Sequence, residues 1–217
     1  MKTSDFIKRE WVFWILILAP TFFALYYWPQ LPDKIPTHWN ASGEMDDYGG
    51  KWAAFLSPMI SVGVYLLMIF IPKIDPRKKN YDLFRGAYWV IRIALAFLLS
   101  LLGFITILAA LQTKMNVGLI IMISILAIFM VMGNQFGKIR PNYFVGIRTP
   151  WTISNEEVWM KTHRLAGRLW VVASAITIPI LFFIPSAMIA YVFLPYIFVI
   201  AAVPIIYSYK IHKTIVH

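Results

Sequence analysis

Residues 90–110 read VIRIALAFLLSLLGFITILAA, an apolar run whose only charge is Arg92. A helix of about 20 apolar residues crosses the hydrocarbon core of a bilayer, so this run predicts a membrane span. The whole chain of 217 residues is 60% hydrophobic and 14% charged, whereas soluble domains carry about 25% charged residues. The composition therefore argues against a soluble protein and indicates an integral membrane protein.

Five further runs have the same character. The predicted spans are residues 11–28, 52–71, 90–110, 116–134, 169–184 and 187–208. The first run lacks a small-residue cleavage site, so we interpret it as an uncleaved span rather than a signal peptide. The last two are divided only at Pro185 and its neighbours, which predicts a very tight connection. The expected fold class is all-α, a polytopic membrane protein with six transmembrane helices.

The positive charges predict the orientation of these spans, because Lys and Arg are retained in short cytoplasmic loops. Sixteen of the 20 lie before the first span, in segments 72–89 and 135–168, or after the last span. Only Lys34, Lys51 and Lys114 lie on the opposite side, and Arg92 lies near the start of the third span. We therefore expect both termini in the cytoplasm. We interpret the net charge of +10 as the result of topology signals and contacts to anionic lipid, not of direct nucleic-acid binding.

The predicted spans contain no Asp, Glu, His or Lys. Transporters and pumps usually hold ionisable residues at membrane depth, so a small-solute transporter is the third-ranked function. Arg92 lies about two turns inside its span, and we expect its side chain to snorkel to the headgroups. Catalytic motifs and cysteines are absent from the sequence, and His38 is on the opposite side from the other histidines. We expect no metal, no cofactor and no enzymatic activity.

The outer segment 29–51 contains the sequence IPTHWNASGEMDDYGGK at residues 35–51. Its prolines and glycines favour an ordered loop. Aromatic residues beside an acidic cluster would suit a cationic, apolar peptide. Alternatively, Trp39 and Tyr48 only anchor the loop on the membrane surface; a cation site is less favoured, because the acidic spacing matches no EF-hand. The candidate recognition residues are His38, Trp39, Asn40, Gly43, Asp46, Asp47 and Tyr48.

The inner segment 135–168 is dense in Gly, Pro and Arg near its start. Ser154 and Glu157 form a predicted capping box, and Glu157 and Lys161 are an i,i+4 pair. We expect an amphipathic helix that lies on the inner membrane face and runs into the fifth span. Its apolar stripe contains Val158, Thr162, Leu165 and Leu169, and its basic stripe contains Lys161, Arg164 and Arg168. The basic residues either bind anionic headgroups or dock a cytosolic protein.

Two stretches resemble the SdpI family of bacterial membrane proteins. The sequence GKIRPNYFVGIRTPWT at 137–152, followed by VWMKTHRLAGR at 158–168, is similar to the family's cytoplasmic signature. The outer stretch IPTHWN at 35–40, with Gly43, Asp46 or Asp47, Tyr48, Gly49 and Lys51, is similar to a small domain that precedes that signature, although Met45 stands where the pattern has Pro. The resemblance covers about 50 residues directly, and the order of the two stretches and the span count agree with the family.

The resemblance implies a non-enzymatic protein of the bacterial plasma membrane. It implies protection against a secreted peptide toxin and signalling that holds a cytosolic transcriptional repressor at the membrane. The expected partners are therefore membrane lipids, that toxin and that repressor. The candidate coupling residues are Gly137, Lys138, Arg140, Pro141, Asn142, Gly146, Arg148, Thr149, Pro150, Trp151, Glu157, Trp159, His163 and Arg164. The alternative is a lipid-handling protein or enzyme at the inner leaflet, in which Arg140, Arg148, His163 and Arg164 bind a phosphate headgroup.

Overall fold

The computed structural model of the chain describes residues 3–40 and 43–216, with the side chains of residues 3–9 and 216 left out. Lys2 and the side chains of Lys8 and Arg9, which entered the orientation argument, lie outside this part. Six helices are long and apolar enough to cross a membrane, which confirms the predicted fold class. They are α1 (Thr3–Tyr27), α2 (Leu56–Ile74), α3 (Arg85–Ala110), α4 (Val117–Phe136), α6 (Glu156–Leu181) and α7 (Ile189–Val216).

Shorter elements connect these helices. A β-hairpin of β1 (Lys34–Trp39) and β2 (Met45–Gly50) stands between α1 and α2 where the sequence predicted an ordered loop, and its strands are antiparallel. The other short elements are η1 (Trp28–Gln30), η2 (Lys51–Phe55), η3 (Lys78–Asp82), α5 (Pro150–Ser154) and η4 (Ser186–Met188). The hairpin, the short helices and the loop between α4 and α5 therefore connect the six long helices.

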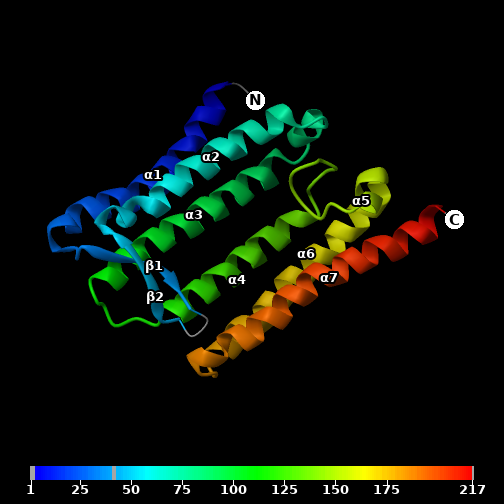
Figure 1. The fold of residues 1–217 in the computed structure, drawn as a ribbon. Helices are drawn as coiled ribbons and strands as arrows, with labels where there is room; N and C mark the ends of the chain where they lie inside the picture. Colours follow the sequence, from blue (N-terminus) through cyan, green and yellow to red (C-terminus); the bar gives the residue numbers. More distant parts are fainter. Residues whose placement is uncertain (1–2, 41–42, 217) are drawn as a thin grey trace.

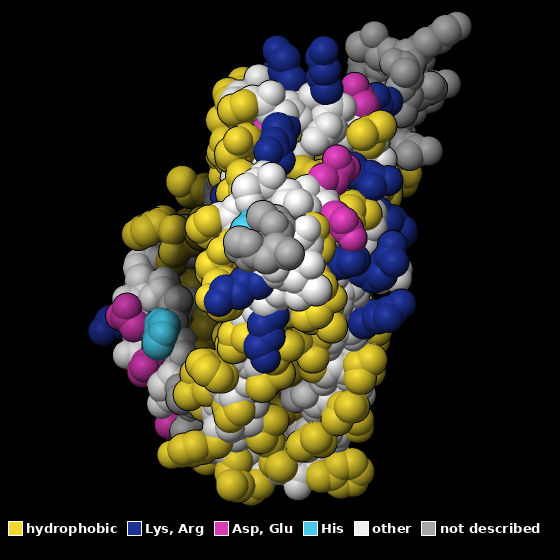
Figure 2. Space-filling view, turned by 90° about the vertical axis from the view of Figure 1, so that its right-hand side faces the viewer, with side chains coloured by type: hydrophobic (Ala, Val, Ile, Leu, Met, Phe, Trp, Pro, Cys, Tyr) yellow, Lys and Arg dark blue, Asp and Glu magenta, His cyan; other side chains and the backbone are white. Residues whose placement is uncertain are grey.

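The helices form two neighbouring groups. Figure 1 shows α1, α2 and α3 on one side and α4, α6 and α7 on the other, with α3 packed against α4. The two termini lie at the same end of the bundle, and the hairpin lies at the opposite end (Figure 1). Figure 2 shows many Lys and Arg side chains over the upper part of the face it presents and hydrophobic side chains below them. This arrangement fits the orientation predicted from the positive charges.

Small residues bring the helix backbones close together. A Cβ on Gly167 of α6 would lie 2.5 Å from the carbonyl oxygen of Gly133 in α4. A Cβ on Gly103 of α3 would lie 2.9 Å from Cβ of Pro20 in α1. Lipid tails are as apolar as leucine, so helices in a membrane associate through close packing rather than through the hydrophobic effect. These glycines therefore hold α4 against α6 and α1 against α3.

Arg92 does not snorkel to the headgroups, and that prediction is wrong. Its side chain is buried, with 6% of the residue exposed, and it donates two hydrogen bonds to Glu10, from Nη1 to Oε1 at 3.1 Å and from Nη2 to Oε2 at 2.8 Å. Because α1 begins at Thr3 rather than near residue 11, Glu10 reaches the depth of Arg92. A buried charge requires a partner. The first span is therefore not free of acidic residues, as the case against a transporter assumed, because it begins at Glu10. The Glu10 carboxylate is paired with Arg92.

The helix before the fifth predicted span also differs from the prediction. α6 runs without a break from Glu156 to Leu181, and its N-cap is Asn155, whose side chain accepts from the Val158 backbone N–H. Ser154 instead donates to the carbonyl of Trp151, so the predicted capping box is wrong. The first part of α6 buries Val158 within the protein and continues into the apolar part of the same helix, as the sequence predicted. The basic stripe of Lys161, Arg164 and Arg168 is exposed.

Candidate functional site

The hairpin holds the outer candidate residues in two groups. His38, Asp46, Asp47 and Tyr48 are exposed on the strands, where His38 Nδ1 lies 2.6 Å from Asp46 Oδ1. Asn40 and Glu44 fasten the turn, because the Asn40 amide donates to Glu44 Oε2 and accepts from the Glu44 backbone N–H. Within the described residues no three His, Asp or Glu side chains are grouped as a metal site.

The turn of the hairpin lies against the start of α4. Gly43 has a φ of +80°, which L residues rarely adopt, and a Cβ there would lie 3.1 Å from Cα of Gly118. Glycine at position 43 is thus required both for the turn and for the close approach to α4. α4 then runs from this contact to the inner segment that contains most of the coupling candidates.

Trp39 lies between two cavities on the outer side. One, of about 310 Å³, is lined by residues of the hairpin, α4 and α7, and the other, of about 410 Å³, by the hairpin and the α3–α4 connection. Trp39 and Gly43 line both of them, and Asn40 lines the first. The indole ring packs against a buried cluster of α3 and α4, and its Nε1–H is buried without an acceptor among the described residues. Trp39 is therefore half-buried, with its ring against the helices.

The inner candidates surround Asn142, whose side chain organises the loop after α4. Its Oδ1 accepts from the backbone N–H groups of Phe144 and Val145, and its Nδ2 donates to the carbonyls of Arg140 and Val145. The residue is 1% exposed. Because both ends of the amide are occupied, Asn142 fixes the backbone conformation of residues 140–145. We call residues 137–152 the signature loop.

Asp75, which the sequence analysis did not single out, connects the α2–α3 segment to the signature loop. Its carboxylate accepts from the backbone N–H groups of Arg77 and Tyr143 and from the hydroxyl of Tyr81, at 2.7–2.9 Å, and the residue is 2% exposed. Burial, and then the hydrogen bond and charge of Asp75, raise the pKa of Tyr81, so this hydroxyl stays a donor. Asn80 adds a hydrogen bond to the carbonyl of Pro141.

His163 is fully buried beneath the signature loop and is not available to a headgroup. Its Nε2 accepts from the Ile147 backbone N–H at 2.9 Å, so Nδ1 carries the proton and donates to the Trp159 carbonyl. The imidazole stacks on Trp159, whose Nε1–H donates to the carbonyl of Ile139. Gly146 has a φ of +110°, and a Cβ there would lie 2.3 Å from His163 Nε2. The loop conformation and the histidine therefore depend on each other.

The remaining coupling candidates lie around this centre. Arg148 donates from Nη1 to the carbonyl of Tyr143 at 2.6 Å, while Arg140 Nη1 lies 3.3 Å from the sulfur of Met160. Arg164 is exposed. Gly137 is the C-cap of α4, and the Lys138 ammonium donates to the Gln135 side-chain carbonyl.

The predicted ion pair is present, with Lys161 Nζ 2.7 Å from Glu157 Oε1. Arg140, Arg148, His163 and Arg164 therefore do not form one phosphate site as the alternative function requires, since His163 is enclosed and Arg148 is bonded to its own loop.

The signature loop is also joined to α7. Thr149 forms a reciprocal capping box with Thr152 at the start of α5, where Pro150 occupies the first turn. The Thr149 hydroxyl lies 3.1 Å from the Ser208 hydroxyl in α7, and the Trp151 ring packs against Tyr209. The loop thus contacts the α2–α3 segment, α6 and α7, which are far apart in the sequence.

Comparisons with known proteins agree with this architecture. Residues 138–208, which include most of the signature loop, match the SdpI/YfhL protein family. The inner part of the chain is therefore similar to that family. Residues 15–62, which include the hairpin, match a domain of unknown function, DUF1648. A relative of the chain is the immunity protein SdpI of Bacillus subtilis (strain 168), 24% identical over 177 residues, which are 82% of this chain and 83% of that protein. No solved structure matches the chain.

The family resemblance expected from the two sequence stretches is therefore confirmed, and so is the placement in a bacterial membrane with several spans. The hairpin and nearly all of the signature loop lie within the two matched regions. These two elements lie at opposite ends of the bundle (Figure 1), so each end holds one candidate site.

Proposed function

We propose that this protein gives immunity to a secreted, membrane-active peptide and reports the bound peptide to a cytosolic transcriptional repressor. The observation that supports the proposal most directly is Trp39, whose indole N–H is buried without an acceptor among the described residues and which lines two cavities. A buried donor without a partner costs free energy, and a peptide carbonyl in either cavity would remove that cost. The relative named as an immunity protein supports the same function.

The acidic face of the hairpin would select the peptide. Asp47 is exposed, and its Oδ1 accepts a local hydrogen bond from the Tyr48 backbone N–H. Together with Glu44 and Asp46 it gives the hairpin a negative surface near the cavities, which attracts a cationic peptide. The apolar walls of the first cavity, including Ile121, Met122 and Phe193, would receive apolar side chains of that peptide.

α4 is the element that would carry the signal. One end of this helix touches the hairpin turn through Gly118, and its other end leads into the signature loop through Gly137. Its 20 residues span about 30 Å at about 1.5 Å per residue, close to the thickness of the hydrocarbon core. A peptide that displaces the hairpin would therefore shift a rigid element whose inner end holds the coupling residues.

The experiment is a survival assay in a Bacillus subtilis strain that lacks its own SdpI, carries this chain, and is challenged with the peptide toxin. Trp39→Phe removes the N–H and keeps most of the ring, and Asp47→Asn removes one charge. Both variants should lower survival at unchanged membrane abundance. Trp52→Phe is the matched control, since Trp52 is 60% exposed on the same side and lines neither cavity. Equal survival of all four strains would contradict recognition by the hairpin.

A further inference from the structure

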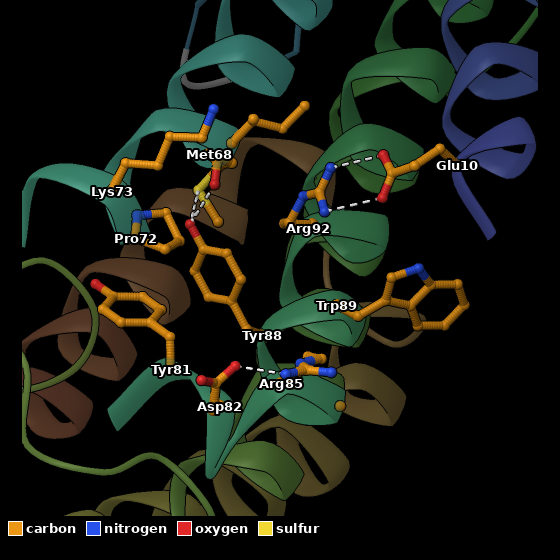
Figure 3. Close-up of a pocket in the computed structure, with 12 residues that line it drawn as sticks. Glu10, Met68, Pro72, Lys73, Tyr81, Asp82, Arg85, Tyr88, Trp89 and Arg92 are labelled. Carbon is orange, nitrogen blue, oxygen red and sulfur yellow. Dashed lines mark hydrogen bonds and ion pairs between the residues drawn. The ribbon is translucent and has the colours of Figure 1, made fainter. Parts of the chain in front are cut away.

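A third cavity, of about 450 Å³, lies between α1, α2 and α3 near the end of the bundle that carries the termini. Glu10 of α1, Met68, Pro72 and Lys73 of α2, and Tyr88 of α3 are among the residues that line it (Figure 3). The hairpin and the signature loop contribute no lining residue to it among those described. The cavity is therefore separate from the two candidate sites above.

The charged side chains around this cavity leave one positive charge uncompensated. Arg92 pairs with Glu10, and Arg85 pairs with Asp82 (Figure 3). Lys73 also lines the cavity, and its ammonium group has no carboxylate partner among the described side chains, only the ring of Phe70 at 5.1 Å. An anion in the cavity would therefore meet a net positive environment.

Two buried N–H groups at the cavity have no acceptor in the part of the chain that is described. They are Nε of Arg92 and Nε1 of Trp89, and both residues line the cavity. Figure 3 shows the guanidinium of Arg92 with Glu10 on one side and Tyr88 and Met68 on the other. Each Nη donates one hydrogen bond to Glu10, while Nε–H is buried and has no acceptor among the described residues. An unpaired buried donor is costly and indicates an acceptor from outside the protein.

We propose that this cavity binds the phosphate-bearing part of an anionic ligand, which is either the headgroup of an inner-leaflet phospholipid or a soluble phosphate ester. Lys73 would attract the phosphate, and the N–H groups of Trp89 and Arg92 would bond ligand oxygens deeper in the cavity. Met68, Ile69 and Pro72 supply an apolar wall. Lys73 lies in the last turn of α2 and Arg85 begins α3, and helix ends lie at the level of headgroups. These features favour the lipid.

The test is native mass spectrometry of the full chain in detergent, titrated with phosphatidylglycerol, phosphatidylcholine or glycerol 3-phosphate. Trp89→Phe removes one donor and keeps the ring, and it should weaken phosphatidylglycerol binding about fivefold, as expected for one hydrogen bond. Trp14→Phe is its control, because Trp14 is exposed on α1 and does not line the cavity. Lys73→Gln should also weaken binding, whereas Lys79→Gln, at an exposed lysine away from the cavity, should not.

The three ligands separate the possible sources. Phosphatidylglycerol that binds more tightly than both phosphatidylcholine and glycerol 3-phosphate supports a lipid headgroup. Glycerol 3-phosphate that binds as tightly, and displaces the lipid, supports a soluble ester. The proposal is overturned if phosphatidylcholine binds as well as phosphatidylglycerol, or if Trp89→Phe and Lys73→Gln both bind like the parent protein. Because the cavity shares no residue with the hairpin, these results do not depend on whether the chain confers immunity.

Discussion

Gly146→Ala tests whether the signature loop and the buried histidine of α6 depend on each other. The added Cβ would lie 2.3 Å from His163 Nε2, far inside a normal contact distance, so either the loop or the imidazole must move. Movement breaks the hydrogen bond from the Ile147 N–H, which leaves buried polar groups unpaired at a cost of about 1–3 kcal/mol. The φ of +110° adds about 1–2 kcal/mol of backbone strain for alanine. We expect a total destabilisation of about 2–5 kcal/mol.

The measurement is the free energy of unfolding in mixed micelles titrated with a denaturing detergent and followed by far-UV circular dichroism. Gly137→Ala is the matched control, because Gly137 lies in the same loop and a Cβ there meets nothing within 4 Å. This control should change the free energy by less than about 1 kcal/mol. Two variants of equal stability would show that the loop accommodates a side chain at position 146, and the argument for mutual dependence would fail.

Four further predictions follow from the same structure. Arg148→Lys should abolish recruitment of the cytosolic partner while the protein still inserts normally. The reason is that lysine lacks the planar guanidinium, which can bond the Tyr143 carbonyl and a partner at the same time. Recruitment at the parent level would instead support a loop that only contacts lipid through its basic residues. Asp75→Asn should lower stability by about 1–3 kcal/mol in the same unfolding assay, since an amide cannot accept all three hydrogen bonds. Glu10→Gln should cost about 3–5 kcal/mol by leaving Arg92 buried and unpaired, and a loss below about 1 kcal/mol would contradict the importance of the pair. Reporter fusions after residues 40, 80, 114, 150 and 217 should read out, in, out, in, in, and an outside signal at 150 would refute the orientation.

The six spans could be predicted from the sequence because a bilayer imposes one length and one polarity on every helix that crosses it. The orientation could be argued from Lys and Arg alone for the same reason. Span ends were less predictable, since a helix continues past the apolar run until a capping residue or a turn stops it. That is why the predicted first span begins at residue 11, whereas α1 begins at Thr3 and includes Glu10.

The sequence indicated which residues form the inner site but not which contacts hold them in place. The density of glycine, proline and arginine indicated a specified backbone, and Asn142 and Gly146 lie at its centre. Asp75 was missed because its partner Tyr143 is 68 residues away, so no local pattern joins them. An acidic residue followed by proline within a strongly basic segment was the one available signal. His163 was likewise identified by type, while its enclosure depends on packing that only the folded chain creates.

The ion pair between Glu10 and Arg92 has a consequence for the synthesis of the protein. The two residues are 82 positions apart, with α2 between them. At about 5–20 residues per second, Arg92 is added about 4–16 s after Glu10. During that interval the carboxylate of α1 must remain in the hydrated headgroup layer, because no partner for it exists yet. The first helix can therefore settle to its final depth only when the third has left the ribosome.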